Sequence, residues 1–318
     1  MKAFGWAVLG CGGIAHGTAS EMVKAGAGRI VAAWNRTPEK AAAFVEKFGG
    51  KAYATAEEAI LAPEVEGVYI AVNPNVHAEL MRLCIKHHKP VLCEKPFTVN
   101  AQEAEDILCY ARAEGVYVSE AMWTWHNQVA LKVREWLRQG RIGEVKRVYC
   151  AFSPDLRGNA RLWDPMMIGG SLMDIGVYNI RYCYELFGLP EGIECADYSL
   201  QGGVDTHEMV TMRYPGFTAE LEIGIDRPCP ETCVIEGTKG TIRVPDFHMA
   251  SVAELEGEHP DRFEDPSLHY AVQFDKVAGE IRGGQPCGVN VTPASTIDVM
   301  RLMDECRRQM GLVYPYEA

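Results

Sequence analysis

Several features are absent from this sequence of 318 residues, and each absence excludes a class of protein. No apolar stretch approaches the ~20 residues that a membrane-spanning helix needs. The net charge of −12, from 43 acidic against 31 basic residues, is not the basic excess that nucleic-acid or anionic membrane surfaces require. No internal repeat and no low-complexity linker divides the chain. We therefore expect a cytoplasmic protein that binds neither nucleic acid nor membranes.

Metal-ligand spacing is absent as well, although cysteine is not scarce. The eleven cysteines contain no Cys-x-x-Cys pair. Cys229 and Cys233 are the closest two, and no second pair stands at zinc spacing from them. Several others lie inside apolar runs, which is typical of reduced, buried thiols. The sequence predicts no metal site and a reducing compartment.

A glycine-rich turn follows directly on the first apolar run. Residues 3–9 predict a buried strand, and Gly10-Cys11-Gly12-Gly13-Ile14-Ala15 has the Gly-x-Gly-x-x-Ala form of a dinucleotide-binding fingerprint. Gly10 permits a tight turn, Gly12 lets a pyrophosphate approach the backbone, and Ala15 lets the next helix lie close to the strand. Free N–H groups at the start of that helix then face the phosphates. The alternative is a purely structural glycine turn.

Strands and helices alternate through residues 1–122. Further strands are predicted at 29–34, 66–72, 90–93 and 116–119. This alternation is typical of parallel βαβ units, so we expect an N-terminal doubly wound Rossmann domain of class α/β. Ligands bind such sheets at the carboxyl ends of the strands, where the segments 10–15, 73–77 and 94–96 are expected to lie. Lys95 at such a strand end is predicted to be a site residue rather than a surface cation.

The pattern changes in residues 123–318, which we expect to form a substrate-binding and oligomerisation domain. Consecutive β-type runs between residues 193 and 244 predict an open, mainly antiparallel sheet with helices on one face. About half of each strand in 193–225 is apolar, and an open sheet must cover such a face. We therefore expect a homodimer or homotetramer through that sheet. Trp123, Trp125 and His126 at the boundary fit a pocket lining or simple packing.

A predicted helix over residues 170–187 carries Asp174 and Tyr178 four residues apart, on one face. The face is either a solvated polar stripe or part of a site. Gly169, Gly170 and Gly176 lower the stability of this helix, which indicates that something approaches it closely.

Together these motifs resemble the glucose–fructose oxidoreductase, inositol dehydrogenase and rhizopine-catabolism (Gfo/Idh/MocA) family. The matching stretches are residues 10–15, 71–77, 89–96, 169–178 and 236–241, of which 89–96 is the most specific. The resemblance implies an NADP- or NAD-dependent dehydrogenase or reductase acting on the CH–OH group of a sugar, polyol or cyclic diol. The cofactor-binding residues that it implies are Gly10, Gly12, Gly13, Ile14, Asn35, Arg36, Asn73, Asn75, His77, Glu94 and Lys95.

The resemblance also implies roles for three catalytic residues. Lys95 would lie beside the nicotinamide and the reacting oxygen, Asp174 would bind the substrate, and Tyr178 would transfer the proton. A tyrosine with its usual pKa near 10 needs a nearby cation to act as a base at neutral pH, and Lys95 would supply it. Many relatives have His in place of Tyr178, and Tyr is typical of the dihydrodiol and aldose (xylose) dehydrogenase branch, which favours a pyranose or cyclic diol over inositol.

The second strand ends without the carboxylate that NAD-specific domains place there to bind the ribose 2′-hydroxyl. The residues at this point are Trp34, Asn35, Arg36 and Thr37. Because Arg36 offers a fork of donors to a 2′-phosphate, NADP is predicted over NAD, although Asn35 can also bond the ribose of NAD. Two other functions stay open: a nucleotide-sensing protein without turnover, and a glycosidase that uses bound NAD transiently.

Overall fold

The computed structural model describes residues 2–317, which divide into two compact units. The first unit contains the chain up to His126 together with Ser267–Ile297. The second contains Asn127–Pro266 and the residues from Asp298 onward. The sequence placed everything after residue 122 in one second domain, so the return of 267–297 to the first unit is a difference that needs a physical cause.

A six-stranded parallel sheet forms the centre of the first unit. Its strands, in the spatial order β3-β2-β1-β4-β5-β6, are β3 (Lys51–Ala52), β2 (Arg29–Trp34), β1 (Gly5–Leu9), β4 (Gly67–Ile70), β5 (Val91–Glu94) and β6 (Val118–Ala121). Every residue of β1, β4, β5 and β6 is buried, as expected for strands covered on both faces. The order reverses between β2 and β4 on either side of β1, which is the doubly wound arrangement that was predicted.

Helices connect these strands. They are α1 (Gly13–Ala25), α2 (Pro38–Phe48), α3 (Ala56–Ile60), α4 (His77–Lys86) and α5 (Ala101–Ala113), with short 3₁₀ turns η1 (Pro74–Val76) and η2 (Trp123–His126). Local sequence sets their starts. Thr55 and Glu58 form a reciprocal capping box on α3, and the Asn100 side chain accepts from the N–H of Glu103 at the start of α5.

The helix α8 (His269–Arg282) explains why residues 267–297 belong to the first unit. Its Phe274 ring meets Trp6 edge-on at 5.2 Å and Tyr69 at 5.0 Å, so it completes the core beside β1 and β4. The hydroxyl of Tyr117 donates to Glu280 at 2.7 Å. This packing could not be predicted from the sequence, because an amphipathic pattern specifies an apolar face and not what covers it.

An eight-stranded mixed sheet forms the second unit. The strands, in spatial order, are β14 (Asp261–Glu264), β13 (Val252–Gly257), β12 (Gly240–Pro245), β11 (Cys229–Gly237), β7 (Val145–Ser153), β10 (Phe217–Gly224), β9 (Val204–Tyr214) and β8 (Gly192–Gln201). All neighbours are antiparallel except β7 and β10, which confirms the mainly antiparallel sheet that was predicted.

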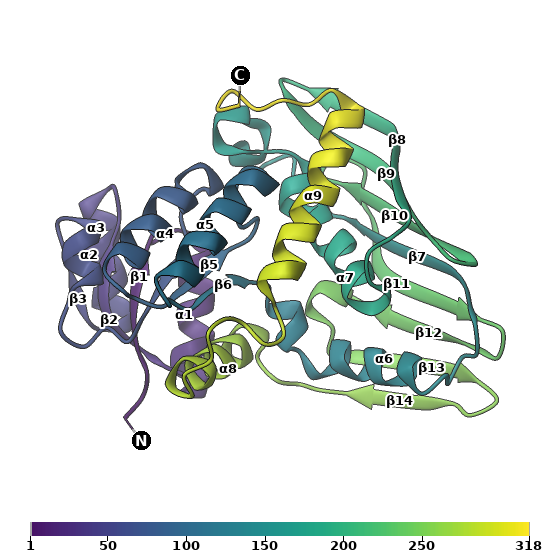
Figure 1. The fold of residues 1–318 in the computed structure, drawn as a ribbon, viewed down its shortest axis with the longest axis horizontal. Coiled ribbons are helices and arrows are strands. Elements are labelled where there is room, and N and C mark those ends of the chain that lie inside the picture. The colour runs from purple at the N-terminus through teal and green to yellow at the C-terminus, as the bar shows by residue number, and fades with distance from the viewer. Residues whose placement is uncertain (1, 318) are drawn as a thin grey trace. The chain divides into compact units, whose positions relative to one another are not determined.

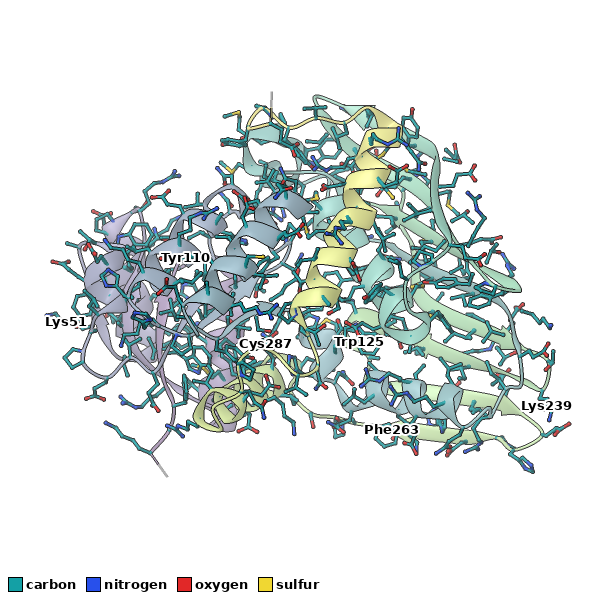
Figure 2. The ribbon with its side chains drawn as sticks, viewed as in Figure 1. Lys51, Tyr110, Trp125, Lys239, Phe263 and Cys287 are labelled. Carbon is teal, nitrogen blue, oxygen red and sulfur yellow. The ribbon has the colours of Figure 1, made fainter. Side chains whose placement is uncertain are left out.

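The helices of this unit lie on one side of the sheet (Figure 1). They are α6 (Gln128–Arg138), α7 (Val177–Phe187) and the part of α9 (Pro293–Met310) that starts at Asp298. Phe263 of β14, labelled in Figure 2, has the ammonium group of Lys132 from α6 at 5.9 Å from its ring. Short turns η3 (Ala160–Trp163), η4 (Pro165–Met167) and η6 (Phe247–Met249) and a π-helix η5 (Leu172–Gly176) complete the unit.

Side chains alternate between core and exterior along most of the two central strands of this sheet. The buried, apolar positions of one parity in β7 and β10 are Val148, Cys150, Phe152, Ala219, Leu221 and Ile223, and Ala151 and Ser153 at the end of β7 are buried as well. The alternate positions carry cross-strand polar pairs, in which Arg147 bonds Glu220 and the hydroxyl of Tyr149 donates to Glu222. The apolar half of these strands therefore lies in the core. The homodimer or homotetramer expected through this sheet stays a prediction.

Candidate active site

The glycine turn between β1 and α1 is held by its neighbours. The N–H of Gly10 donates to the carbonyl of Trp34 at 2.8 Å, and its φ of 96° lies in the left-handed region. A Cβ on Gly10 would stand 2.4 Å from the carbonyl oxygen of Ala71, so only glycine fits. At Gly12 and Gly13, in contrast, an added Cβ would meet no atom of the chain within 4 Å. The turn is closed toward the sheet and open on the side of the helix start.

Asn35 at the end of β2 connects this turn to the next loop. Its Oδ1 accepts from the N–H of Cys11 at 3.0 Å, and its Nδ2 donates to the carbonyl of Thr37 at 3.0 Å. Both ends of this amide are therefore bonded to the backbone. Arg36 beside it is exposed, and its guanidinium makes no ion pair within the described residues. Thr37 is the N-cap residue of α2, as predicted, but its side chain makes no capping bond.

His77 joins the loop after β4 to the loop after β5. It is fully buried, with Nε2 at 3.1 Å from the carbonyl of Val72 and Nδ1 at 3.1 Å from that of Pro96. Burial lowers the pKa of this imidazole to about 4, so it is neutral at physiological pH. A neutral imidazole has a single N–H and donates to only one of these carbonyls at a time, and the contact with Pro96 is the one that links the two loops. Asn73 and Asn75 lie in the same loop, and both are half-buried.

Glu94 and Lys95 follow one another at the carboxyl end of β5. The buried carboxylate of Glu94 accepts from the hydroxyl of Tyr69 on β4 and from the N–H of Lys95 at 3.3 Å. Burial raises the pKa of Glu94 to about 7, against the lowering effect of those two hydrogen bonds and of the Lys95 charge. Lys95 is half-buried, and the bond to Pro96 is cis. Of the three segments predicted to meet at this edge of the sheet, 73–77 and 94–96 are thus in contact through His77, while 10–15 is bonded to the end of β2.

In the second unit, the predicted helix over 170–187 begins with the π-helix η5 and continues as α7. Single π turns of this kind are frequent at functional sites. Gly170 has a φ of 108°, and a Cβ there would stand 2.1 Å from the Asp205 carboxylate. The chain's own strand β9 therefore approaches Gly170 closely, while Gly169 lies against the carbonyl of Leu162 and Gly176 against Ile223 of β10. Asp205 also accepts from the hydroxyl of Ser171 at 2.8 Å.

Asp174 and Tyr178 occupy the η5–α7 junction. The Asp174 carboxylate pairs with Nη2 of Arg161 at 2.7 Å, and both side chains are partly exposed. Tyr178 is only 5% exposed, so the alternative of a solvated polar stripe is wrong here. Its ring lies 6.1 Å from that of Phe152 and 5.2 Å from the imidazole of His248.

Several of these neighbours carried no signal in the sequence. Arg161 stood out only as one cation in a loop, and neither Tyr69 nor His248 belongs to any motif. His248 reaches Tyr178 across 70 positions of the chain, and Tyr69 reaches Glu94 across 25. Such contacts depend on strand pairing, which a single sequence does not reveal.

Two kinds of feature are absent from the described residues. No group of three or more His, Cys, Asp or Glu side chains in residues 2–317 is arranged to hold a metal ion. Within the same residues, no helix is both long enough and apolar enough to cross a membrane.

Comparison with known proteins identifies the two halves of the chain. Residues 4–122 match the model of the oxidoreductase family with an NAD-binding Rossmann fold, and residues 130–243 match that of the GFO/IDH/MocA C-terminal domain. The trans-1,2-dihydrobenzene-1,2-diol dehydrogenase of Danio rerio is 30% identical over 98% of both chains. The scyllo-inositol 2-dehydrogenase (NADP(+)) IolU of Bacillus subtilis is 31% identical over 90% of this chain and 91% of the relative.

Solved structures share the fold. The aldose–aldose oxidoreductase from Caulobacter crescentus, complexed with glycerol, has a TM-score of 0.87 at 21% identity and covers 97% of each chain. The 3-ketoreductase KijD10 from Actinomadura kijaniata, in complex with NADP and TDP-benzene, has a TM-score of 0.84 at 22% identity over 97% of this chain and 98% of its own. With the family models and the full-length relatives, the conclusion is that the chain belongs to the Gfo/Idh/MocA family of NAD(P)-dependent oxidoreductases.

Proposed function

We propose that the protein transfers a hydride between NADP and the carbinol carbon of a sugar, polyol or cyclic diol. The observation that carries the proposal is the arrangement at the carboxyl edge of the parallel sheet. There, Asn35 bonds the fingerprint turn to the loop after β2, and His77 lies between the loop of Asn73–His77 and the segment Glu94–Pro96. This is the edge at which doubly wound sheets bind dinucleotides.

The residues of this edge fit a dinucleotide. The space beside Gly12 and Gly13 is open where side chains would otherwise stand, and the N–H groups at the start of α1 are suited to bind a pyrophosphate. Asn73, Asn75 and the pair Glu94–Lys95 would hold the nicotinamide half. The exposed guanidinium of Arg36, to which no acid among residues 2–317 is paired, supports binding of a 2′-phosphate and hence NADP over NAD. When bound, the nicotinamide supplies the hydride chemistry.

The chain's own residues would handle the proton and the substrate. We assign proton transfer to Tyr178 in the second unit, and to Lys95 in the first unit stabilisation of charge on the reacting oxygen. Asp174 would accept from a substrate hydroxyl, with Arg161 holding the carboxylate and offering its remaining N–H groups to a neighbouring oxygen. His77, neutral and bonded to backbone carbonyls, would act by positioning the loops rather than as a base.

The substrate class follows from these polar groups and from the relatives. One relative is named for a dihydrodiol and another for an inositol. We therefore keep inositol among the candidate substrates, although the presence of Tyr178 favoured a pyranose or cyclic diol. A homodimer or homotetramer is also part of the proposal. A monomeric mass by light scattering at micromolar concentration would contradict it.

The test is steady-state turnover with NADP and NAD against a panel of aldoses, polyols and cyclic diols, followed by absorbance of the reduced cofactor. We expect turnover of at least one class, with a higher kcat/KM for NADP. No turnover with any substrate, despite measurable NADP binding, would instead favour a nucleotide-sensing protein. Copurification of tightly held NAD would favour a glycosidase that uses it transiently.

A further inference from the structure

The turn η6, which follows β12, lies against the ring of Tyr178. Its His248 imidazole stacks on Phe152 with ring centroids 4.3 Å apart and planes at 24°. The same imidazole meets the Tyr178 ring at 5.2 Å and 62°. Phe152 and Tyr178 are themselves 6.1 Å apart, so the three rings form one cluster. The orientation of the Tyr178 ring thus depends on the orientation of the imidazole.

Glu231 on β11 fixes that imidazole. A single oxygen, Oε1, accepts from Nδ1 of His248 at 2.7 Å and from the backbone N–H of His248 at 2.9 Å. The two side chains are 12% and 15% exposed, so water competes little for these bonds. An ionised carboxylate only accepts, and it therefore requires the proton on Nδ1. Glu231 sets both the tautomer and the plane of the ring.

The backbone adds to this hold. The N–H of Asp246 donates to the carbonyl of Glu231 at 3.3 Å, and the N–H of Met249 closes the turn onto the carbonyl of Asp246 at 2.9 Å. Asp246 has a φ of 48°, in the left-handed region that aspartate tolerates better than most residues. One glutamate therefore anchors the turn through its main chain and the imidazole through its side chain.

We propose that Glu231 and His248 are positioning residues for Tyr178. The carboxylate holds the imidazole, and the imidazole, with Phe152 behind it, limits the tilt of the phenol ring and so the direction of its hydroxyl. Proton transfer is sensitive to such alignment, because a misplaced donor or acceptor loses the near-attack geometry. This inference rests on the role proposed for Tyr178. It adds two residues that no sequence motif indicated.

A double-mutant cycle tests the proposal. His248→Ala is expected to lower kcat roughly tenfold while KM and the NADP dissociation constant stay within about twofold of wild type. In a Tyr178→Phe background the same substitution should have no further effect on kcat, because the two residues act through one hydroxyl. His248→Phe, which keeps the stack on Phe152 but removes both nitrogens, guards against a variant that fails to fold, and we expect it to lose kcat as well.

Two matched variants sharpen the result. Glu231→Gln keeps an acceptor oxygen for Nδ1 and should remain near wild type, whereas Glu231→Ala should resemble His248→Ala. The surface pair His87–Glu57, at 2.6 Å in the first unit, has the same chemistry, so His87→Ala serves as the control with no effect in either background. Additive losses in the cycle, or losses in KM rather than kcat, would overturn the proposal.

A measurement that does not depend on turnover can test the positioning of Tyr178 separately from the proposed function. With isotopically labelled tyrosine, the ring resonances of Tyr178 are identified by their absence in Tyr178→Phe. They should move in His248→Ala and Glu231→Ala, and stay in place in Glu231→Gln and His87→Ala. Resonances that do not move would refute the positioning role even if the enzyme is active. Wild-type turnover in Tyr178→Phe would refute the acid–base role of Tyr178 and, with it, the catalytic part of this inference.

Discussion

The two sheets of this protein position chemistry in different ways. In the parallel sheet, the topology places the loops of the candidate site. The carboxyl ends of β1, β4 and β5 lie at the same edge, next to the point at β1 where the strand order reverses. In the mixed sheet, the functional side chains stand on the η5–α7 segment and depend on individual contacts with β9, β11 and the turn η6. Local motifs therefore predict where the loops of the parallel sheet lie, whereas the surroundings of η5 and α7 are specified by long-range packing.

The largest effect is expected from two substitutions, each of which removes a proposed catalytic group from one unit. Lys95→Met and Tyr178→Phe should each lower kcat by about 10²-fold or more, the scale of a lost acid–base group, with little change in NADP affinity. Stopped-flow and steady-state assays with the best substrate of the panel measure this. If only one of the two substitutions lowers kcat, only one unit supplies a catalytic group, and the proposal that both units do so is refuted.

A pair of glycine substitutions separates fold from function. Gly170→Ala forces a Cβ against Asp205 at a φ of 108° and should destabilise the protein by about 2 kcal/mol or more. Gly12→Ala meets no atom of the chain and should leave the unfolding midpoint unchanged while weakening NADP binding. Chemical denaturation and cofactor titration of both variants measure these effects. Equal loss of stability in both would show that the turn at Gly12 is not open for a ligand.

The next effect tests cofactor choice. Charge-assisted contacts are worth roughly 1.5–3 kcal/mol, so Arg36→Ala should lose about tenfold or more in kcat/KM with NADP and little with NAD. The comparison of both cofactors in wild type and variant provides its own control. An unchanged ratio would mean that another group binds the 2′-phosphate, or that NAD is the natural cofactor.

The smallest effect concerns the buried acids beneath η5. Glu208 and Asp205 share the hydroxyl of Ser171, and burial together with the neighbouring Asp205 carboxylate raises the pKa of Glu208 well above 4.5. A raised folded-state pKa means that the stability from this group is complete below pH 4.5 and is lost as pH rises toward the folded-state pKa. Glu208→Gln cannot ionise, so its melting temperature should exceed that of wild type by a margin that grows from pH 5 to pH 8. A constant margin would indicate that Glu208 does not titrate in this range.

Some elements of the fold could be predicted from the sequence and others could not. The fingerprint, the parallel sheet and the strands β8 to β12 follow from local patterns, and they were predicted. The strands β13 and β14 were missed because charged residues occupy alternate positions of Val252–Gly257 and most of Asp261–Glu264, as is common at sheet edges. The π turn at η5 and the contact of Gly170 with Asp205 were also beyond reach, since each requires β9 to be in place.

The return of α8 to the first unit has a consequence for synthesis. Trp6 and Tyr69 emerge from the ribosome early, but Phe274, which packs on both rings, is made roughly 150 residues after the first unit is otherwise complete. At about 5–20 residues per second, this apolar surface stays uncovered for on the order of ten seconds or more. We therefore expect the nascent N-terminal half to expose apolar surface of the kind that chaperones bind, and a chain truncated before residue 269 to be less soluble than the full chain.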